Sequence, residues 1–249
     1  MTHDSTVNQL TVSPDDAGLH VELLQKNRWF RDLPAEAINE MVGMARLERL
    51  DDGQRLHAQG DLPDGLYGVS KGNVRISNTG ADGREALLTV LAAGSWFGEI
   101  SLFDGLPRTH DAHAMGATEL LFIPRRDFQQ LLRRRPELYP HFMRLLCARL
   151  RSSFDMLEDS ALLPLAARLA KRLLMHAQHY GEVGRDNERL SIRLSQETLG
   201  LMLNSSRQSI NRLLKQFEQA GWVSIHYGQI SILDEDALTR VVTGTATGQ

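Results

Sequence analysis

The chain is almost free of cysteine, since Cys147 is the single one among 249 residues. One thiol cannot build a disulfide framework, a cysteine-rich zinc site or a four-thiolate iron–sulfur cluster. Long apolar runs are also missing, because none approaches the roughly 18 residues of a membrane-spanning helix. The polar N-terminus lacks the basic and then apolar order of a secretory signal. We therefore expect a cytoplasmic protein with no metal site.

No strong excess of charge of either sign is present, and the net charge is −3. Hydrophobic residues make up 42% and charged residues 24%, as in globular proteins of one large or two modest domains. From Pro164 onward the chain has 10 Lys and Arg against 8 Asp and Glu, whereas the remainder has 18 against 23. The mildly basic C-terminal third is compatible with nucleic-acid binding there.

Signals of catalysis are absent as well. The sequence shows no nucleophile–base pair at a telling spacing, no phosphate-loop lysine and no metal-ligand motif. We therefore predict no catalytic residue, and we expect a protein that is not an enzyme.

Short apolar runs separated by turn signals fill residues near 46 to 125. "GLYGVS", "NVRIS" and "EALLTVL" alternate with "DDGQ", "SKGN" and "NTGADGRE". Several short strands with a turn every 8 to 12 residues predict an antiparallel barrel or roll. A small closed roll offers a pocket in which a small ligand can sit.

A long helix is predicted from about 138 to 162, because Pro136 and Pro140 lie near its start and Pro164 at its end. A spacing of four and three places five of its residues on one coiled-coil seam: Leu146, Leu150, Ser153, Leu157 and Ser160. The seam has two interpretations. The helix packs on its own domain, or it pairs two copies of the chain, with the central Ser153 hydroxyl facing the partner or a ligand.

The segment from 164 to 236 has the pattern helix, helix, helix, hairpin. "SQETLGLMLN" and "SSRQSINRLLKQFEQAG" are two short helices joined by "NSS", and "WVSIHYGQISIL" alternates around Tyr227–Gly228 as a two-strand hairpin. Ser195 suits the first N-cap, Asn204 suits a left-handed turn residue, and Ser205 or Ser206 suits the second N-cap. This layout is typical of a helix-turn-helix with a wing.

The second short helix carries cations and amides opposite its apolar face. In a helix-turn-helix, the N-terminal residues of this helix enter the major groove, where Arg pairs with guanine and Gln or Asn with adenine. The candidate DNA contacts are Ser206, Arg207, Gln208, Asn211 and Arg212. Two alternatives stay open. The polar face is merely solvated, or Gln208 forms a capping box with Ser205 and satisfies the backbone instead of a base.

Two stretches together resemble the cyclic-AMP receptor/fumarate-nitrate regulator (CRP/FNR) family of bacterial transcription factors. "GSWFGEISLFDGLPRTHDAHA", residues 94 to 114, is similar to the phosphate-binding cassette of that family, which has F-G-E and, about nine residues on, P-R-S/T-A. "LSQETLGLMLNSSRQSINRLLKQFEQAGWV" is similar to its helix-turn-helix. The resemblance covers about residues 25 to 238 and implies an α+β protein.

We therefore expect five successive segments. They are a flexible N-terminus (1–24), an effector-sensing antiparallel β-roll like a cyclic-nucleotide-binding domain (25–135), a dimerisation helix (136–163), a winged helix-turn-helix DNA-binding domain (164–238) and a C-terminal tail (239–249).

The cassette residues carry over one by one. Gly98 and Glu99 match the pair that holds the ribose of a cyclic nucleotide, Arg108 matches the arginine on the cyclic phosphate, and Thr109 matches the adjoining hydroxyl residue. Ser153 falls where cyclic-AMP receptors have a hydroxyl residue that meets the adenine. The chemistry is sound, because Arg offers a fork of donors to phosphate and Glu accepts from a sugar hydroxyl. Cyclic AMP, another nucleotide or metabolite, and no ligand at all stay open.

Three departures from the family pattern matter. Phe154 lies where cyclic-AMP receptors have a second hydroxyl residue from the partner subunit. Gln208 replaces a glutamate that accepts from cytosine, and Gln favours adenine. His110 follows Thr109 in place of a small residue, and with His113 it would lie on opposite faces of a strand. We favour local hydrogen bonds over metal or haem ligation for these histidines.

The resemblance implies a homodimeric, effector-responsive regulator that binds a two-fold symmetric site on double-stranded DNA and activates transcription by touching RNA polymerase. Two alternatives stay open. One is a cyclic-nucleotide-binding-like module that acts through a protein partner, for which a docking helix should expose apolar anchors. The other is a regulator of the same family with no ligand.

Overall fold

The computed structural model describes residues 8–11, 18, 20–22, 33–80, 82–83, 85–180, 182–183, 190–226 and 229–244. The chain divides into two compact units, Met1–Leu150 and Arg151–Gln249, which are described in turn. Across the described residues, none of the helices combines the length and the apolar character needed to cross a membrane.

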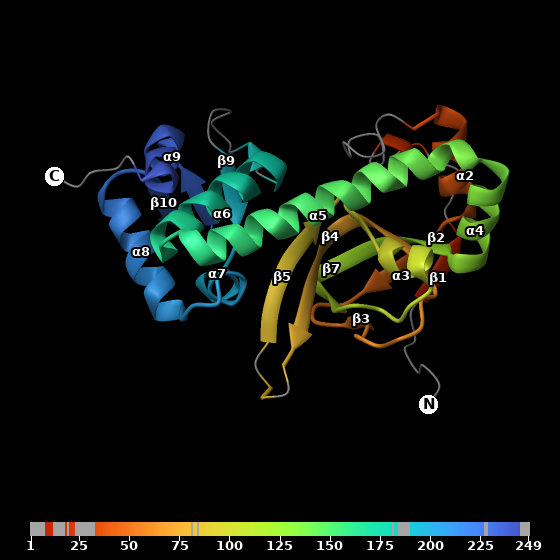
Figure 1. Ribbon diagram of the computed structural model, residues 1–249, viewed down its shortest axis with the longest axis horizontal. Coiled ribbons are helices and arrows are strands. Elements are labelled where there is room, and N and C mark those ends of the chain that lie inside the picture. Colours follow the sequence, from red (N-terminus) through yellow and green to blue (C-terminus); the bar gives the residue numbers. More distant parts are fainter. Residues whose placement is uncertain are drawn as a thin grey trace. The chain divides into compact units, whose positions relative to one another are not determined.

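The first unit is built on an antiparallel sheet that forms the predicted roll (Figure 1). Its strands run in the order β1 (Asn8–Thr11), β2 (Arg46–Leu50), β7 (Asp111–Pro124), β4 (Gly65–Thr79) and β5 (Glu85–Ala92). The short β3 (Arg55–His57) pairs with β7, and β6 (Trp96–Phe97) pairs with β4. Register shifts interrupt the long β4–β7 and β4–β5 ladders, and such bulges let a strand bend, as a roll requires.

Two apolar clusters stabilise this unit. One lies within the roll and centres on the rings of Tyr67, Phe97 and Phe122. The other packs Leu66, Leu121 and neighbouring sheet residues against α2 (Ala35–Met44), α4 (Arg125–Arg134) and the short 3-10 turn Pro136–Leu138. The sequence analysis did not anticipate α2 or the short α3 (Glu99–Asp104) inside the cassette.

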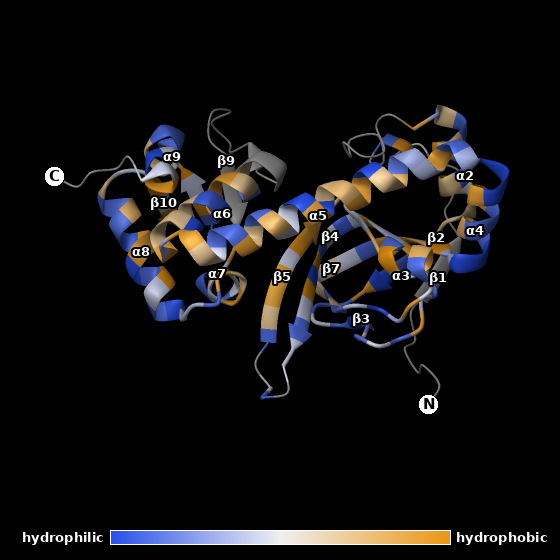
Figure 2. Ribbon diagram, viewed as in Figure 1, coloured by the Kyte–Doolittle hydropathy of each residue, from blue (hydrophilic) through white to orange (hydrophobic). Residues whose placement is uncertain are grey.

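The long helix α5 extends over Tyr139–Leu162, in agreement with the predicted 138 to 162. Its N-terminal part buries Phe142 and Leu145 in the cluster with α2 and α4. Further along, the ribbon alternates apolar and polar stretches (Figure 2), and several of the apolar side chains are exposed. The N-terminal part of the helix is therefore anchored in the core of the first unit, and apolar side chains stay exposed further along.

The second unit combines α6 (Leu165–Tyr180), α7 (Gln196–Met202), α8 (Arg207–Gln219) and α9 (Glu235–Thr243) with a small sheet. That sheet has the order β10 (Val223–His226), β11 (Gln229–Ile232), β9 (Leu190–Arg193) and β8 (Glu182–Val183). The predicted hairpin is confirmed as β10 and β11, and its expected turn Tyr227–Gly228 lies outside the described residues. Strands β8 and β9 were not anticipated.

Two predicted segment ends need correction. Asn8–Thr11 lies within the N-terminus predicted to be flexible, yet it forms β1 and pairs with β2. Helix α9 crosses the predicted boundary at 238, so 239–243 is helical and not part of a tail. Asp234 caps α9 by accepting from the Ala237 amide, and Ala237 and Leu238 are buried, which explains why the chain stays ordered there.

Candidate effector cassette and nucleic-acid interface

Arg108 lies at the centre of the cassette and is only 3% exposed. Its Nη1 donates to the Gly98 carbonyl at 2.9 Å, and its Nη2 donates to the Gly65 carbonyl at 2.7 Å. Gly98 has φ +93°, and a Cβ there would lie 2.6 Å from Arg108 Nη1. Only glycine allows the backbone to take this conformation and to approach the guanidinium so closely.

Asp64, in the loop before β4, is a cassette residue that the sequence analysis missed. Its carboxylate accepts from Arg108 Nη2 at 2.5 Å and from the Tyr67 hydroxyl at 2.5 Å. The signal available in the sequence was an acid in the "LPDG" turn, directly before an apolar strand. Because Asp64 and two carbonyls hold both terminal nitrogens, the arginine fork is fixed in one orientation.

One donor of this guanidinium has no such acceptor. Arg108 Nε is buried and has no hydrogen-bond partner among the described residues. The guanidinium carbon lies 5.5 Å from the centroid of the Tyr67 ring. A buried donor without an acceptor costs stability unless something binds there, and a phosphate oxygen is an acceptor that suits it. The site therefore fits an anionic group.

Glu99 is the first residue of α3 and is completely buried. Its Oε1 forms an ion pair with Arg149 Nη1 on α5 at 2.7 Å, and Arg149 Nη2 donates a hydrogen bond to the Trp96 carbonyl. Burial raises the pKa of Glu99, while the positive charges of Arg149 and then Arg108 oppose that rise. Arg149 was also missed, although it lies one helical turn before Ser153 in the sequence.

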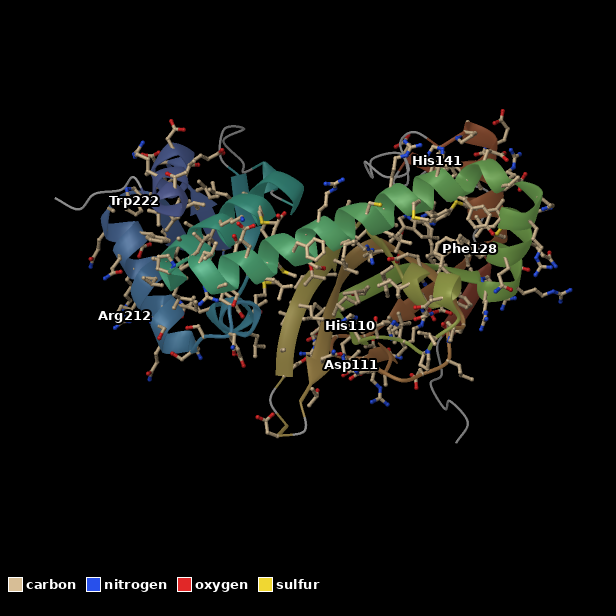
Figure 3. The ribbon with its side chains drawn as sticks, in the orientation of Figure 1. His110, Asp111, Phe128, His141, Arg212 and Trp222 are labelled. Carbon is tan, nitrogen blue, oxygen red and sulfur yellow. The ribbon has the colours of Figure 1, made fainter. Side chains whose placement is uncertain are left out.

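The polar residues that follow Arg108 make local contacts. Thr109 is exposed, and its Oγ1 lies 2.7 Å from His110 Nδ1. Asp111 accepts from the Gln59 amide at 2.8 Å, and Figure 3 shows His110 and Asp111 at the start of β7. Burial lowers the pKa of His110, and Asp111 opposes this. Within the described ranges no three His, Cys, Asp or Glu side chains gather as metal ligands.

Ser153, the remaining predicted effector residue, belongs to a different compact unit from the cassette residues. It is exposed on α5 and belongs to the second compact unit. Gly98, Glu99, Arg108 and Thr109 all belong to the first unit. The contact of Ser153 with a ligand therefore stays a prediction.

The helix-turn-helix is confirmed in α7 and α8. Its turn requires a left-handed residue at one position and a glycine at another. Asn204 has φ +48°, the left-handed conformation that Asn tolerates. The Ser205 backbone amide donates to the Gly200 carbonyl at 2.9 Å, and a Cβ on Gly200 would lie 2.8 Å from the Ser205 backbone carbonyl oxygen. Glycine is thus needed where the turn folds back onto α7.

Both helices are capped by serine. Ser195 Oγ accepts from the Thr198 amide at 3.0 Å, and Ser206 Oγ accepts from the Ser209 amide at 3.1 Å. The proposed capping box of Ser205 with Gln208 is therefore wrong, because Ser206 is the N-cap and Ser209 occupies the third helical position.

The N-terminal face of α8 is open. Arg207, Gln208 and Arg212 are exposed, and none of them has a hydrogen bond or ion pair within the part of the chain that the structure describes. Figure 3 shows Arg212 projecting from α8. Asn211 differs, because it is half-buried and its Oδ1 accepts from Gln196 Nε2 on α7 at 3.2 Å. It braces the two helices, while its neighbours are free to meet a ligand.

Comparison with known proteins gives two family matches. A family described as "Cyclic nucleotide-binding domain" matches residues 47–135, and one described as "Crp-like helix-turn-helix domain" matches residues 167–241. The cassette and α8 fall inside these two matches.

Individual relatives cover most of the chain. A "CRP-like cAMP-activated global transcriptional regulator" of Mycobacterium tuberculosis is 30% identical over 219 residues, which are 88% of this chain and 98% of that protein. The "Cyclic AMP receptor protein" of Thermus thermophilus is 28% identical over 87% of this chain and 97% of its own. The structure of FixK2 from Bradyrhizobium japonicum superposes with a TM-score of 0.73 at 18% identity, covering 82% of this chain and 99% of that one, and shows the shared fold.

The fold, the cassette, the helix-turn-helix and these relatives agree. Members of this group are transcription regulators and not enzymes. The chain belongs to the CRP/FNR family of DNA-binding transcription regulators and has a cyclic-nucleotide-binding domain and a Crp-like helix-turn-helix domain.

Proposed function

We propose that this chain is a homodimeric activator of transcription whose binding to a two-fold symmetric DNA site is controlled by a small phosphate-bearing effector in the roll. The observation that carries the proposal is the open polar face of α8, with Arg207, Gln208 and Arg212 exposed and unpaired in the described structure. Two arginines and an amide can contact guanine and adenine edges in the major groove. The face presents no apolar anchor for a protein partner.

The proposal of a homodimer depends on a row of exposed apolar side chains on α5. Met143, Leu150, Phe154 and Leu157 are between 55% and 68% exposed. Met143, Leu150 and Leu157 follow one another at seven-residue steps, which is the spacing of a coiled-coil seam. A row of this kind is covered most simply by the same helix of a second copy. Two copies would present two α8 helices to half-sites about one DNA turn, roughly 34 Å, apart.

The proposal of a phosphate-bearing effector depends on the cassette. Arg108 is held in one orientation with a buried, unpartnered Nε, and Glu99 lies beside it at the start of α3. Arg108 would bind the phosphate, and Glu99 and Gly98 would meet a sugar. Cyclic AMP is the first candidate, since a relative at 30% identity is described as cAMP-activated. Thr109 and Ser153 would complete the contacts. In this proposal the DNA-bound dimer activates transcription in the cytoplasm by touching RNA polymerase.

The DNA assignment is tested with a duplex selected from a random pool by the wild-type protein. Arg207→Ala should weaken binding to that duplex by about 5- to 150-fold, the equivalent of about 1–3 kcal/mol for one bidentate base contact. Arg126→Ala removes the same charge from an exposed position on α4 and should leave the affinity unchanged. Equal affinity of the Arg207 variant and the wild type in a gel-shift titration would contradict the assignment.

The effector assignment is tested by thermal shift and calorimetry with cyclic AMP, cyclic GMP, other nucleotides and unphosphorylated metabolites. A ligand at 100 times its Kd stabilises the folded protein by about 2.7 kcal/mol. Arg108→Leu should abolish the shift given by a phosphate-bearing ligand. Arg108→Lys keeps the charge and loses the fork, so it should bind more weakly. A full shift in both variants would rule out the cassette as the phosphate site.

A further inference from the structure

One buried side chain of the roll is not used by any contact described so far. His57, the last residue of β3, is 6% exposed. Neither of its ring nitrogens has a hydrogen-bond partner among the described residues. Its ring centroid lies 6.2 Å from that of Tyr67 and 6.3 Å from that of Phe97. A buried imidazole whose ring nitrogens make no well-formed hydrogen bond with the described residues loses hydrogen bonds to water, so its presence needs a reason.

A second group with an unsatisfied nitrogen lies near the Tyr67 ring. The guanidinium carbon of Arg108 lies 5.5 Å from the Tyr67 centroid, and Arg108 Nε is also buried without a partner. The other two nitrogens of Arg108 are held by Asp64, Gly65 and Gly98. Arg108 Nε and the ring nitrogens of His57 thus lie near the Tyr67 ring without a hydrogen-bond partner among the described residues.

The electrostatics connect these two groups. Burial, and next the positive charge of Arg108, lower the pKa of His57 to about 4, whereas Asp64, Asp61 and the backbone of His110 favour its charged form more weakly. The rings that pack against His57 from β4 and β6, Tyr67 and Phe97, bring no positive charge. His57 is therefore neutral near pH 7 before an anion binds. An anion on Arg108 would offset the charge that repels a proton from His57.

We propose that His57 is a further effector-binding residue, whose ring donates a hydrogen bond to the anionic group of a phosphate-bearing ligand held by Arg108. The inference rests on the proposed function, because it needs an anion in the cassette. On binding at mildly acidic pH, His57 takes up one proton from the buffer and becomes an imidazolium, so the charge added by the ligand is partly balanced. Effector affinity then rises as the pH falls.

The test is calorimetry of the full-length protein with cyclic AMP between pH 5.5 and pH 7.5, in two buffers of different ionisation heat. If the bound anion returns the pKa of His57 to its ordinary value of 6.5, the affinity should be about tenfold higher at pH 5.5 than at pH 7.5. The two buffers should reveal proton uptake that approaches one per site at pH 5.5. His57→Leu should lose both the pH dependence and the proton uptake.

His113→Leu is the matched control. His113 lies on β7 opposite Arg55 of β3, and it has a lowered pKa caused by burial and by Arg75, so it is a second roll imidazole outside the proposed contact. Its variant should keep the pH dependence. Loss of the dependence in the His113 variant and its survival in the His57 variant would overturn the inference.

The outcomes separate this inference from the proposed function. Cyclic AMP binding that needs Arg108 but has the same pH profile in the His57 variant overturns only the role of His57. If neither cyclic AMP nor any other phosphate-bearing probe of the effector panel binds the wild type, both are overturned. If His57→Leu does not fold, the ring resonances of His57 in the wild-type protein decide. Their titration midpoint should rise from about 4 to above 6 with saturating ligand, and an unchanged midpoint overturns the inference.

Discussion

The cassette and the N-terminal face of α8 both use arginine, but in opposite states. Arg108 is 3% exposed and three acceptors from its own chain hold it, whereas Arg207 and Arg212 are exposed and unpaired in the described structure. The groups proposed to bind a small effector inside the roll can be buried and oriented in advance. A DNA duplex cannot enter the protein, so the groups that contact it must project from the surface.

This difference predicts where substitutions act. A cassette residue belongs to the fold as well as to the site, so its loss should cost stability even without a ligand. Arg207, Gln208 and Arg212 are exposed and have no partner in the described structure, so the loss of one of them should change DNA binding alone. The following predictions test that distinction, beginning with the largest effect.

Arg149→Leu should destabilise the protein by about 3–5 kcal/mol, because it leaves the fully buried Glu99 without its cation. Urea denaturation at fixed protein concentration measures the change. Adding Glu99→Gln to the same variant removes the unpaired charge and should restore part of the loss. A single variant as stable as the wild type would mean that the cassette is not held together by this ion pair.

The stability of the wild type should fall as the pH is lowered from 6.5 to 4, by up to about 3 kcal/mol from His57. Its pKa is about 4 in the fold and near 6.5 in the unfolded chain, so the unfolded state binds more protons in this window. The stability associated with neutral His57 is fully present above pH 6.5 and is lost as the pH falls towards 4. Denaturation curves of the wild type and His57→Leu at several pH values isolate it, since only the wild type should show this slope. Parallel slopes would contradict the buried, neutral state of His57.

Gln208→Glu should change the preferred base at one position of each half-site from adenine to cytosine, by about 1–3 kcal/mol, because a carboxylate accepts from cytosine and cannot donate to adenine. Duplex selection with the variant and the wild type reads the change directly. Its unfolding free energy should stay within about 0.5 kcal/mol of the wild type, because Gln208 is exposed and unpaired in the described structure. An unchanged consensus would show that Gln208 does not contact a base.

Ser206→Ala should destabilise the second unit by about 1 kcal/mol, since it removes the side chain that caps α8 by accepting from the Ser209 amide. Thermal unfolding measures the effect, and Ser205→Ala is its control. Similar losses in both variants would mean that the cap is shared between the two serines. Ser206, like Asn211 with its bond from Gln196, is a candidate DNA contact that also contributes to the fold.

Local pattern predicted the elements in which one face is apolar. The four-and-three spacing of α5 and the prolines that bound it predicted its ends closely. The alternation of β10 and β11 predicted the hairpin. By contrast β8 and β9 are short strands: β9 pairs with β11, which lies far along the chain, and β8 joins the sheet only through β9. Helix α3 was not predicted, because the cassette that contains it was interpreted for its ligand chemistry and not for its secondary structure.

The residues of α8 could be named from the pattern of the sequence, and those of the cassette from the resemblance of residues 94 to 114 to the CRP/FNR family. The state of each residue could not. The sequence did not indicate that Asp64 and Arg149 hold Arg108 and Glu99, that Gln196 holds Asn211, or that His57 lies unpaired beside the Tyr67 ring. Those partners lie 15 to 50 residues apart, and only the folded chain brings them within hydrogen-bonding distance and removes the water that would otherwise compete.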